Sequence, residues 1–398
     1  MDTPEPSRRG RQALPLIAGS LAAVVVASLI YLHPALPSLP KPPAAPRSPS
    51  PATIPARYGA QYDFISATTG WALLVATSPP TRFYVYRTTD GAKHWTMQLS
   101  ADLAIPGFDE FKFFDSKRGV IWIGSPDRLY RTSDGGTHWD PVALPPYQVN
   151  LVTFSDPVHG WLLASERDQE LLRHFLVTID GGSTWTELAW PKGAAWANDG
   201  GAGHLQFRRP GEGWLAAAGA PEPTVYSTVD GGASWEPHAL PTPSGPGLVV
   251  DTTVGLLPGV GVIAYTDYSQ GVGIPTNSFA YTSTDGGTTW RSVTPPAYCP
   301  RGRSSPCPSI PPWLVTFQDT SHWWVASPDT VWESSDAGQS WQSVYQQLDN
   351  WVSQPQFVDV KHGWAELFMG SAGGQLSGLA MTSDGGLHWT QVDAPRPS

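Results

Sequence analysis

The sequence predicts an all-β fold, a seven-bladed β-propeller built from four-stranded blades. Three observations lead to this prediction. One eight-residue phrase returns seven times at intervals of 44 to 55 residues, which indicates an array or a closed ring of small sheets. A second, strand-like pattern lies upstream of these phrases. The 398 residues include 40 Gly, 41 Pro and 19 Trp but only 15% charged residues, and no long stretch has helical periodicity.

The repeated phrase reads Ser/Thr-x-Asp-x-Gly-x-x-Trp. We expect its Asp or Thr side chain to accept hydrogen bonds from backbone N–H groups two or three residues on, which closes a tight turn. The Gly supplies a positive φ, and the Trp begins the next strand with its ring buried beneath the turn. The aspartates and tryptophans are Asp90 and Trp95, Asp134 and Trp139, Asp180 and Trp185, Asp230 and Trp235, Asp285 and Trp290, Asp336 and Trp341, and Asp384 and Trp389.

These phrases are identified as Asp-boxes, also called BNR repeats. The resemblance implies that each lies on the turn between the third and fourth strands of a propeller blade. Two copies vary: the first has Ala92 in place of the fixed Gly, and the sixth has Ala337 at the variable position before Gly338. We expect all box residues to stabilise the fold and not to take part in chemistry.

The second pattern is a short strand, a polar turn ending in Gly, and a strand opening with Trp. Examples are FISATTGWALLV from Phe64 and LVTFSDPVHGWLLAS from Leu151. The second unit has its Trp displaced to Trp122, and the fifth unit has lost it. With the strands on either side of each box, this makes four strands per unit. The propeller is predicted over residues 58–396, about 48 residues per blade.

The N-terminus predicts a membrane anchor and a spacer. Residues 13–32 are uncharged and apolar, long enough to span a bilayer as a helix, and three Arg lie in the basic tail 1–12 before them. The positive-inside tendency then places the propeller outside the cytoplasm on a single-pass signal anchor. A cleaved signal peptide is the alternative. Residues 33–57 hold nine Pro and form a semi-rigid, extended linker.

Two cysteines, Cys299 and Cys307, lie in the segment CPRGRSSPC. An exported chain with this spacing is expected to form one disulfide. Arg301 and Arg303 project from the same loop, either as solvated charges or as a contact for an anionic partner.

Charge and motifs exclude several functions. The net charge of −10 argues against nucleic acid, which needs a basic surface. The sequence has no zinc-protease motif, phosphate-binding loop, zinc-spaced Cys pair or nucleophile elbow, so we expect no metal and no cofactor. Sialidases are six-bladed Asp-box enzymes, but their Arg-Ile-Pro signature is absent here. Xyloglucan-cleaving enzymes pair two propellers, and this chain has residues for one. A glycosidase carboxylate pair assembled from scattered residues stays open.

The paired Gly-Trp and Asp-box signals over residues 58–396 resemble those of the photosystem II stability and assembly factor family. That resemblance implies a seven-bladed exported propeller that binds a protein partner. It specifies the fold strongly and a photosynthetic role weakly, because a fold does not carry function.

One face of the predicted propeller gathers aromatic and polar residues around the central mouth. The loops 165–174, 266–278 and 369–378, which join second and third strands, are expected on that face. Such a surface suits a peptide loop or a sugar, although the rings could instead pack between blades. The candidate residues are Tyr62, Asp109, Glu110, Tyr147, Asn150, Trp196, Asp199, Trp313 and Trp351.

The sequence therefore predicts a membrane-anchored, extracytoplasmic propeller that acts as a non-enzymatic binding or assembly platform for a protein. Three alternatives stay open: a binding protein for an envelope glycan, a sialidase-like glycoside hydrolase, and a purely structural spacer.

Overall fold

The computed structural model describes most of the chain between residues 53 and 397. The described ranges are 53–54, 58–76, 80–103, 110–124, 127–166, 169–194, 205–217, 222–242, 248–257, 259, 261–269, 277–294, 296, 315–326, 330–346, 350–369 and 376–397. The predicted signal anchor and nearly all of the linker lie outside these residues. No helix within the described ranges is long and apolar enough to cross a membrane.

Seven four-stranded antiparallel sheets form the blades, each with its strands in chain order. Blade one has β1 (Tyr58–Phe64), β2 (Gly70–Ala76), β3 (Arg82–Thr88) and β4 (Thr96–Asp102), and blade two has β5 (Glu110–Phe113), β6 (Gly119–Gly124), β7 (Asp127–Thr132) and β8 (Asp140–Val142). Blade three has β9 (Gln148–Phe154), β10 (Gly160–Glu166), β11 (Gln169–Thr178) and β12 (Thr186–Leu188), and blade four has β13 (Leu205–Arg209), β14 (Glu212–Ala217), β15 (Thr224–Thr228) and β16 (Glu236–Ala239). Blade five has β17 (Leu248–Leu256), β18 (Val262–Ser269), β19 (Asn277–Ser283) and β20 (Arg291–Val293). Blade six has β21 (Val315–Phe317), β22 (Trp323–Ala326), β23 (Thr330–Ser334) and β24 (Gln342–Gln346), and blade seven has β25 (Asn350–Phe357), β26 (Gly363–Met369), β27 (Leu376–Thr382) and β28 (Thr390–Val392).

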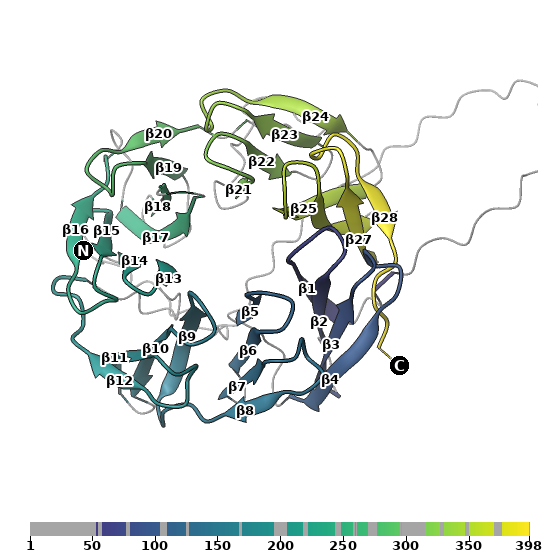
Figure 1. Cartoon of the computed structure of the whole chain (residues 1–398). Helices are drawn as coiled ribbons and strands as arrows, with labels where there is room; N and C mark the ends of the chain where they lie inside the picture. The colour runs from purple at the N-terminus through teal and green to yellow at the C-terminus, as the bar shows by residue number, and fades with distance from the viewer. Residues whose placement is uncertain are drawn as a thin grey trace, which may run out of the picture. The chain divides into compact units, whose positions relative to one another are not determined.

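The blades stand in a ring with the first strand of each nearest the centre (Figure 1). Hydrophobic clusters fill the space between neighbouring blades, including a cluster that joins blade seven to blade one. The predicted seven-bladed propeller of four-stranded blades is confirmed.

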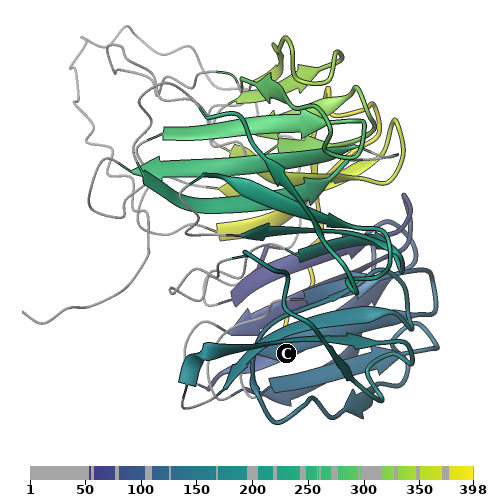
Figure 2. The ribbon, with the colours of Figure 1, turned by 90° about the vertical axis from the view of Figure 1, so that its left-hand side faces the viewer.

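The Asp-boxes share one face of the ring with the turns between first and second strands. Backbone bonds join the two sets: Gly91 N–H donates to the Thr68 carbonyl at 2.9 Å, and Gly385 N–H donates to the Lys361 carbonyl at 2.8 Å. We call this the box face and the opposite one the mouth face. In the side view the tight hairpin turns gather on one side (Figure 2).

The box turn is closed by the expected short bonds, such as Asp90 N–H to Thr88 Oγ1 at 3.4 Å, and also by bonds that span four residues. In box one, Ala92 N–H donates to Thr88 Oγ1 at 3.0 Å, and His94 N–H donates to Asp90 Oδ1 at 3.0 Å. The Thr hydroxyl in turn donates to the same carboxylate. Positive φ is confirmed along the turn: Gly91 has φ 73° and Ala92 has φ 65°, so this box holds a non-glycine residue in left-handed backbone.

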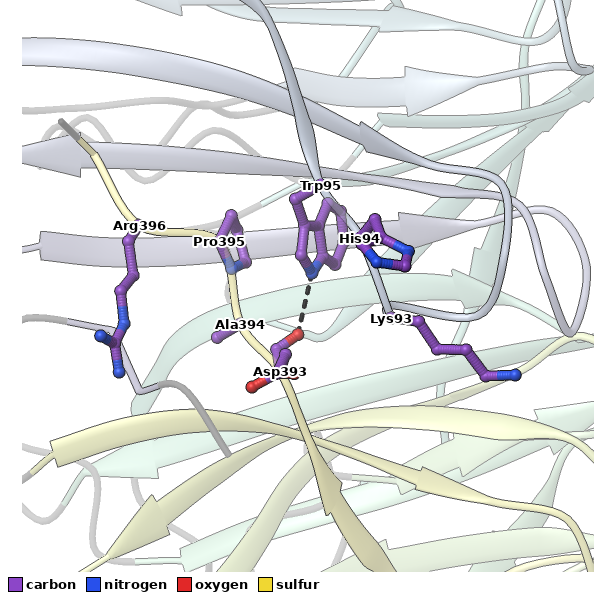
Figure 3. Close-up of a pocket in the computed structure, with 7 residues that line it drawn as sticks. All are labelled: Lys93, His94, Trp95, Asp393, Ala394, Pro395 and Arg396. Atoms are coloured by element: carbon purple, nitrogen blue, oxygen red, sulfur yellow. Dashed lines mark hydrogen bonds between the residues drawn. The ribbon is translucent and has the colours of Figure 1, made fainter. Parts of the chain in front are cut away.

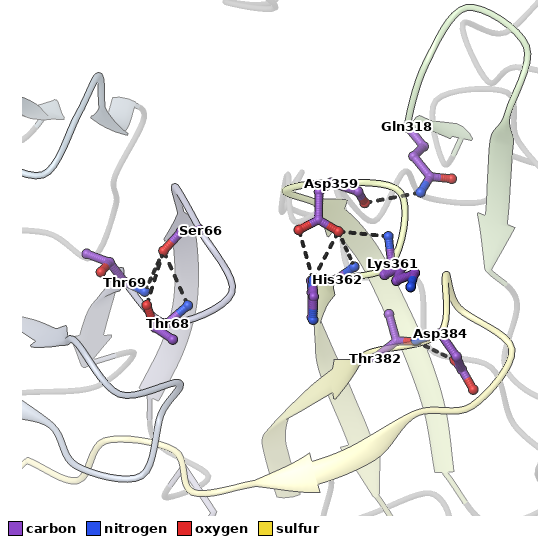
Figure 4. Close-up of polar contacts among 9 residues, drawn as sticks. All are labelled: Ser66, Thr68, Thr69, Gln318, Asp359, Lys361, His362, Thr382 and Asp384. Carbon is purple, nitrogen blue, oxygen red and sulfur yellow. Dashed lines mark hydrogen bonds and ion pairs between the residues drawn. The ribbon is translucent and has the colours of Figure 1, made fainter.

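The turns between first and second strands use the same chemistry at shorter range. Asp359 accepts from the N–H groups of Lys361 and His362, both at 2.8 Å (Figure 4). In blade one, Ser66 takes this role and accepts from the N–H groups of Thr68 and Thr69. These side chains pre-set the turn geometry without help from other blades.

Aromatic stacking holds neighbouring blades together. The Gly-Trp tryptophan of one blade lies flat on a Phe at the end of the next blade's first strand: Trp364 on Phe64 at 3.8 Å between ring centroids, Trp71 on Phe113 at 3.6 Å, and Trp161 on Phe207 at 3.4 Å. The Gly is required because the Phe covers it; a Cβ on Gly70 would lie 2.2 Å from the Phe64 ring.

The box tryptophans are less buried than expected. Trp389 is buried, with 8% of its surface exposed, but the other six are half-buried at the seams between blades. Several meet the seam Phe edge-on, as Trp95 meets Phe64. The box Trp therefore lies against the Gly of its own turn, as Trp235 lies against Gly232, and also covers the rim of a seam.

Trp323 fills the seam between blades five and six. Blade five has Ile263 and blade two has Val120 where the other five blades have a Trp, and blade six has Trp323 where most blades have Gly. The Trp323 ring is 1% exposed, shares a cluster with Ile263, and lies 2.6 Å from the Cβ position of the box Gly338. A ring from the following blade thus fills the space left by the missing one.

The ring closes without a shared strand. Blade one and blade seven are each built from one continuous stretch of chain. Side-chain bonds to backbone join them: Phe64 N–H donates to Gln356 Oε1 at 3.0 Å, Trp95 Nε1 donates to the Asp393 carbonyl at 2.8 Å, and the Tyr86 hydroxyl donates to the Arg396 carbonyl at 3.0 Å. Closure depends on side chains and the segment after β28.

We expect Trp323→Gly to lower the free energy of unfolding by about 3–5 kcal/mol, because it empties a packed seam. This holds even though Gly is the residue at this position in most other blades. Urea denaturation followed by Trp fluorescence measures the change, and adding Ile263→Trp should recover more than half of it. The exposed Val229→Ala serves as control, with an effect within about 0.5 kcal/mol. An unchanged midpoint in Trp323→Gly would show that Trp323 does not support the seam.

Candidate functional site

A charged cluster lies where the first strands of blades seven, one and two approach one another. Asp63, Lys112 and Gln356 each come directly before the seam Phe of their own blade, and Glu110 lies two residues before Lys112 on the same strand. All four are half-buried on the innermost strands of the ring (Figure 1). Propeller centres commonly hold ligand or catalytic groups, so this is the first place to test for chemistry.

These side chains tie each blade to the next. Gln356 accepts from Phe64 N–H, and Asp63 Oδ2 accepts from Phe113 N–H. Glu110 lies near Phe154 N–H, which lowers the pKa of its carboxyl group. Further bonds run the same way: Lys112 Nζ donates to the Phe154 carbonyl at 2.8 Å, and Gln356 Nε2 donates to Asp63 Oδ1 at 3.1 Å. We call this chain of contacts the inner clasp. It links four blades, from seven through one and two to three.

Burial sets the charge of the clasp. Desolvation raises the pKa of Glu110 to about 7, opposed by the nearby Lys112 ammonium and by the bond from Phe154. Desolvation also raises the pKa of Asp63, opposed by its bonds from Phe113 and Gln356 and by Lys112. Two carboxyl groups and an ammonium are the parts of an acid–base site. Here, however, Asp63 and Lys112 are engaged in bonds between blades, so these two groups hold neighbouring blades together.

Tyr62, one of the predicted binding residues, lies in the seam between blades seven and one. Its ring packs on the cluster that includes Trp364 and Leu379. The hydroxyl has no hydrogen-bond partner among the described residues. Burial, followed by the charge of Glu366, raises its pKa well above the ordinary value. Tyr62 and Glu110 thus contribute to packing and to the clasp.

Tyr147 and Asn150 both belong to blade three. The Tyr147 ring stacks on His174 with 3.9 Å between centroids, and His174 lies between Glu187 at 2.8 Å and Glu166 at 3.3 Å. Asn150 Oδ1 accepts from the Ser165 hydroxyl at 3.1 Å. The segment 165–174 is mainly hairpin and not the long loop expected, since β10 continues to Glu166 and β11 begins at Gln169.

The remaining predicted binding residues are not brought together by the described structure. Trp351 lies on β25, paired in register with Phe368 of β26. The others lie outside the described residues: Asp109, Trp196, Asp199, Cys299, Arg301, Arg303, Cys307 and Trp313. A binding role for these residues stays a prediction. In the described part of the chain, no group of three or more His, Cys, Asp and Glu is placed to hold a metal ion.

Sequence reasoning missed the inner clasp. Its signal is a polar residue directly before the seam Phe, as in Asp63, Lys112 and Gln356. From the sequence alone, a polar residue at that position of an inner strand is expected to be solvated. Only the ring geometry shows that its side chain reaches the next blade.

Comparison with known proteins shows the fold and no family. No protein-family model matches the chain, and no curated protein matches it. Among solved structures, YCF48 from Cyanidioschyzon merolae is similar, with TM-score 0.52, 17% identity, and 84% of this chain and 98% of that chain covered. The predicted resemblance to the photosystem II assembly factor family is confirmed by this match at the level of fold.

Hydrolase structures carry similar propellers. A puromycin-hydrolyzing peptidase from Mycobacterium tuberculosis matches with TM-score 0.53 and 12% identity over 86% of this chain and 54% of that chain. The β-propeller domain of the Trilobed protease from Pyrococcus furiosus matches with TM-score 0.50 and 7% identity over 84% of this chain and 99% of that chain. At these identities the similarities describe architecture alone.

We expect Glu110→Gln to stabilise the protein at alkaline pH. The folded pKa of Glu110, about 7, lies above its ordinary value of 4.5, so the folded state holds an extra proton between these values. Stability therefore falls as pH rises from about 4.5 to about 7, and the loss persists above 7. A Gln keeps the acceptor for Phe154 N–H, as Gln356 does for Phe64, and has no charge to desolvate.

Urea denaturation at several pH values tests this expectation. At pH 8 the Glu110→Gln variant should exceed the wild type by on the order of 2 kcal/mol, and the two should converge near pH 4.5. The reverse change, Gln356→Glu, should introduce a new loss of stability at high pH. Parallel pH profiles for wild type and Glu110→Gln would contradict the assignment.

Proposed function

We propose that this protein is a non-enzymatic binding platform for a protein partner. The observation that carries the proposal is the inner clasp. Burial raises the pKa values of Asp63 and Glu110. Asp63 accepts a backbone hydrogen bond across a seam. Glu110 lies beside Lys112, which is bonded to the Phe154 carbonyl of the next blade. A general acid or nucleophile needs its reacting atom open to substrate, and the clasp holds these side chains in the scaffold. The rigid ring then serves to present its faces to a partner.

A protein partner is favoured by the surface chemistry that the sequence places on the mouth face. Aromatic side chains with amides and carboxylates between them suit a folded loop or a peptide. The shared architecture with YCF48 is compatible with such a role but supplies only the fold. The same mouth could hold an envelope glycan, and the experiment below separates the two.

The proposed location is outside the cytoplasm, on a single-pass anchor. It rests on the uncharged stretch 13–32, the three Arg in the tail 1–12, and the nine Pro in residues 33–57. A polyproline linker of this length extends on the order of 75 Å at about 3.1 Å per residue. Such a spacer would carry the propeller away from the bilayer toward a partner.

The proposal is tested by affinity capture with the full-length protein in mild detergent, from membrane and cell-wall fractions of its own organism. We expect one specific protein in the eluate, identified by mass spectrometry. Its capture should be lost with the double variant Trp196→Ala/Trp351→Ala, which removes two mouth aromatics, because such residues dominate binding energy. Capture should persist with Val229→Ala, an exposed change on the box face.

A glycan array with the same preparation gives the competing result. A specific glycan that binds without a captured protein would replace the proposal with carbohydrate binding. Release of sugar from that glycan would overturn the non-enzymatic assignment. Absence of any partner in both experiments would favour a structural spacer.

A further inference from the structure

A groove opens on the box face at the seam between blades seven and one. Its volume is about 510 Å³, and its walls come from the two ends of the propeller. Lys93, His94 and Trp95 belong to box one, and residues 393–396 follow β28 (Figure 3). This groove lies on the face opposite the predicted mouth, so it is independent of the site proposed above.

Hydrogen bonds from two side chains to backbone carbonyls hold the groove in shape. Trp95 Nε1 donates to the Asp393 carbonyl at 2.8 Å, and the Tyr86 hydroxyl donates to the Arg396 carbonyl at 3.0 Å. Ala394 and Pro395 are buried between these two anchors. The segment is therefore fixed, and a ligand would not have to order it on binding.

The rim of the groove is cationic on an otherwise acidic protein. Lys93 and Arg396 are exposed, and neither forms an ion pair with any residue that the structure describes. Asp393 is the acidic residue among those lining the groove. The floor, by contrast, is apolar, with the half-buried Trp95 ring beside Ala394 and Pro395. The lining thus carries two cations and one carboxylate beside an apolar floor, a net positive set that complements a ligand with both carboxylates and apolar groups.

The box turn does not require a histidine at the position of His94. In every box the residue before the Trp donates to the box carboxylate at 2.6–2.7 Å. His fills the position in blades seven, one and two, while Thr184, Ser234, Thr289 and Ser340 fill it in the other four. A hydroxyl therefore closes the turn as well as an imidazole does.

Ionisable groups surround His94 on both walls of the groove. Asp90 lies on its own turn, with 2.6 Å between Oδ2 and the imidazole Nδ1. Lys93 precedes it, and Asp393 and Arg396 lie on the segment across the groove (Figure 3). The imidazole itself is 87% exposed, and histidine is the side chain that gains charge between pH 8 and 5.

We propose that this groove binds an extended acidic peptide segment with interspersed apolar side chains. Its carboxylates contact Lys93 and Arg396, and its apolar side chains pack on the half-buried Trp95 ring. A polyuronate would satisfy the cations but has no apolar side chains for the floor, which favours the peptide.

Fluorescence anisotropy with the full-length protein in detergent tests the site. The probe is a fluorescein-labelled octapeptide of alternating Glu and Leu, and the control probe has Gln in place of Glu. We expect salt-sensitive binding of the Glu probe alone. Lys93→Gln and Arg396→Gln should each weaken it by about threefold and together by about tenfold, as exposed ion pairs do. Equal binding to the double variant, or equal competition by polygalacturonate, would overturn the proposal.

Discussion

The contact that joins most of the blades is the flat stack of a Trp from one blade on a Phe from the next, which recurs at four of the seven seams between the described blades. Trp364 on Phe64 and Trp161 on Phe207 show it in its regular form. The stack needs a glycine beneath the Phe, because any Cβ there would occupy the position of the ring. Large buried rings supply most of the apolar area that a small sheet can offer its neighbour, so blades that cannot stand alone become stable together.

The seam between blades five and six lacks this stack and shows that a seam requires a filled volume and not a particular residue. Ile263 leaves space that a Trp fills elsewhere, and Trp323 enters it from the opposite blade. The glycine rule is broken there without a clash, because Phe317 meets the new ring edge-on at 5.1 Å. The Trp323 ring thus restores close packing at this seam from the opposite blade.

Stacking and the inner clasp together account for the charged groups of the described centre. Burial raises the pKa values of Asp63 and Glu110. Asp63 also accepts a backbone hydrogen bond across a seam, and this bond fixes its position. Side chains such as Lys93 and His94 project from the rigid turns of the box face. The same turns tolerate His, Thr or Ser next to the Trp, so a face can vary while the scaffold stays constant.

The sequence by itself determined the blade number, the four-strand unit and the box turns, because each is local. The Thr, Asp and Gly of a box lie within a few residues of one another, and their bonds form inside one turn. Tertiary structure alone decided the burial of Tyr62, the clasp through Asp63 and Glu110, the place of Trp323, and the groove between Trp95 and Asp393. The two sides of that groove are 298 residues apart in the chain. Contacts of this kind exist only once the ring has closed, and repeat patterns within single blades carry no information about which side chains meet across a seam.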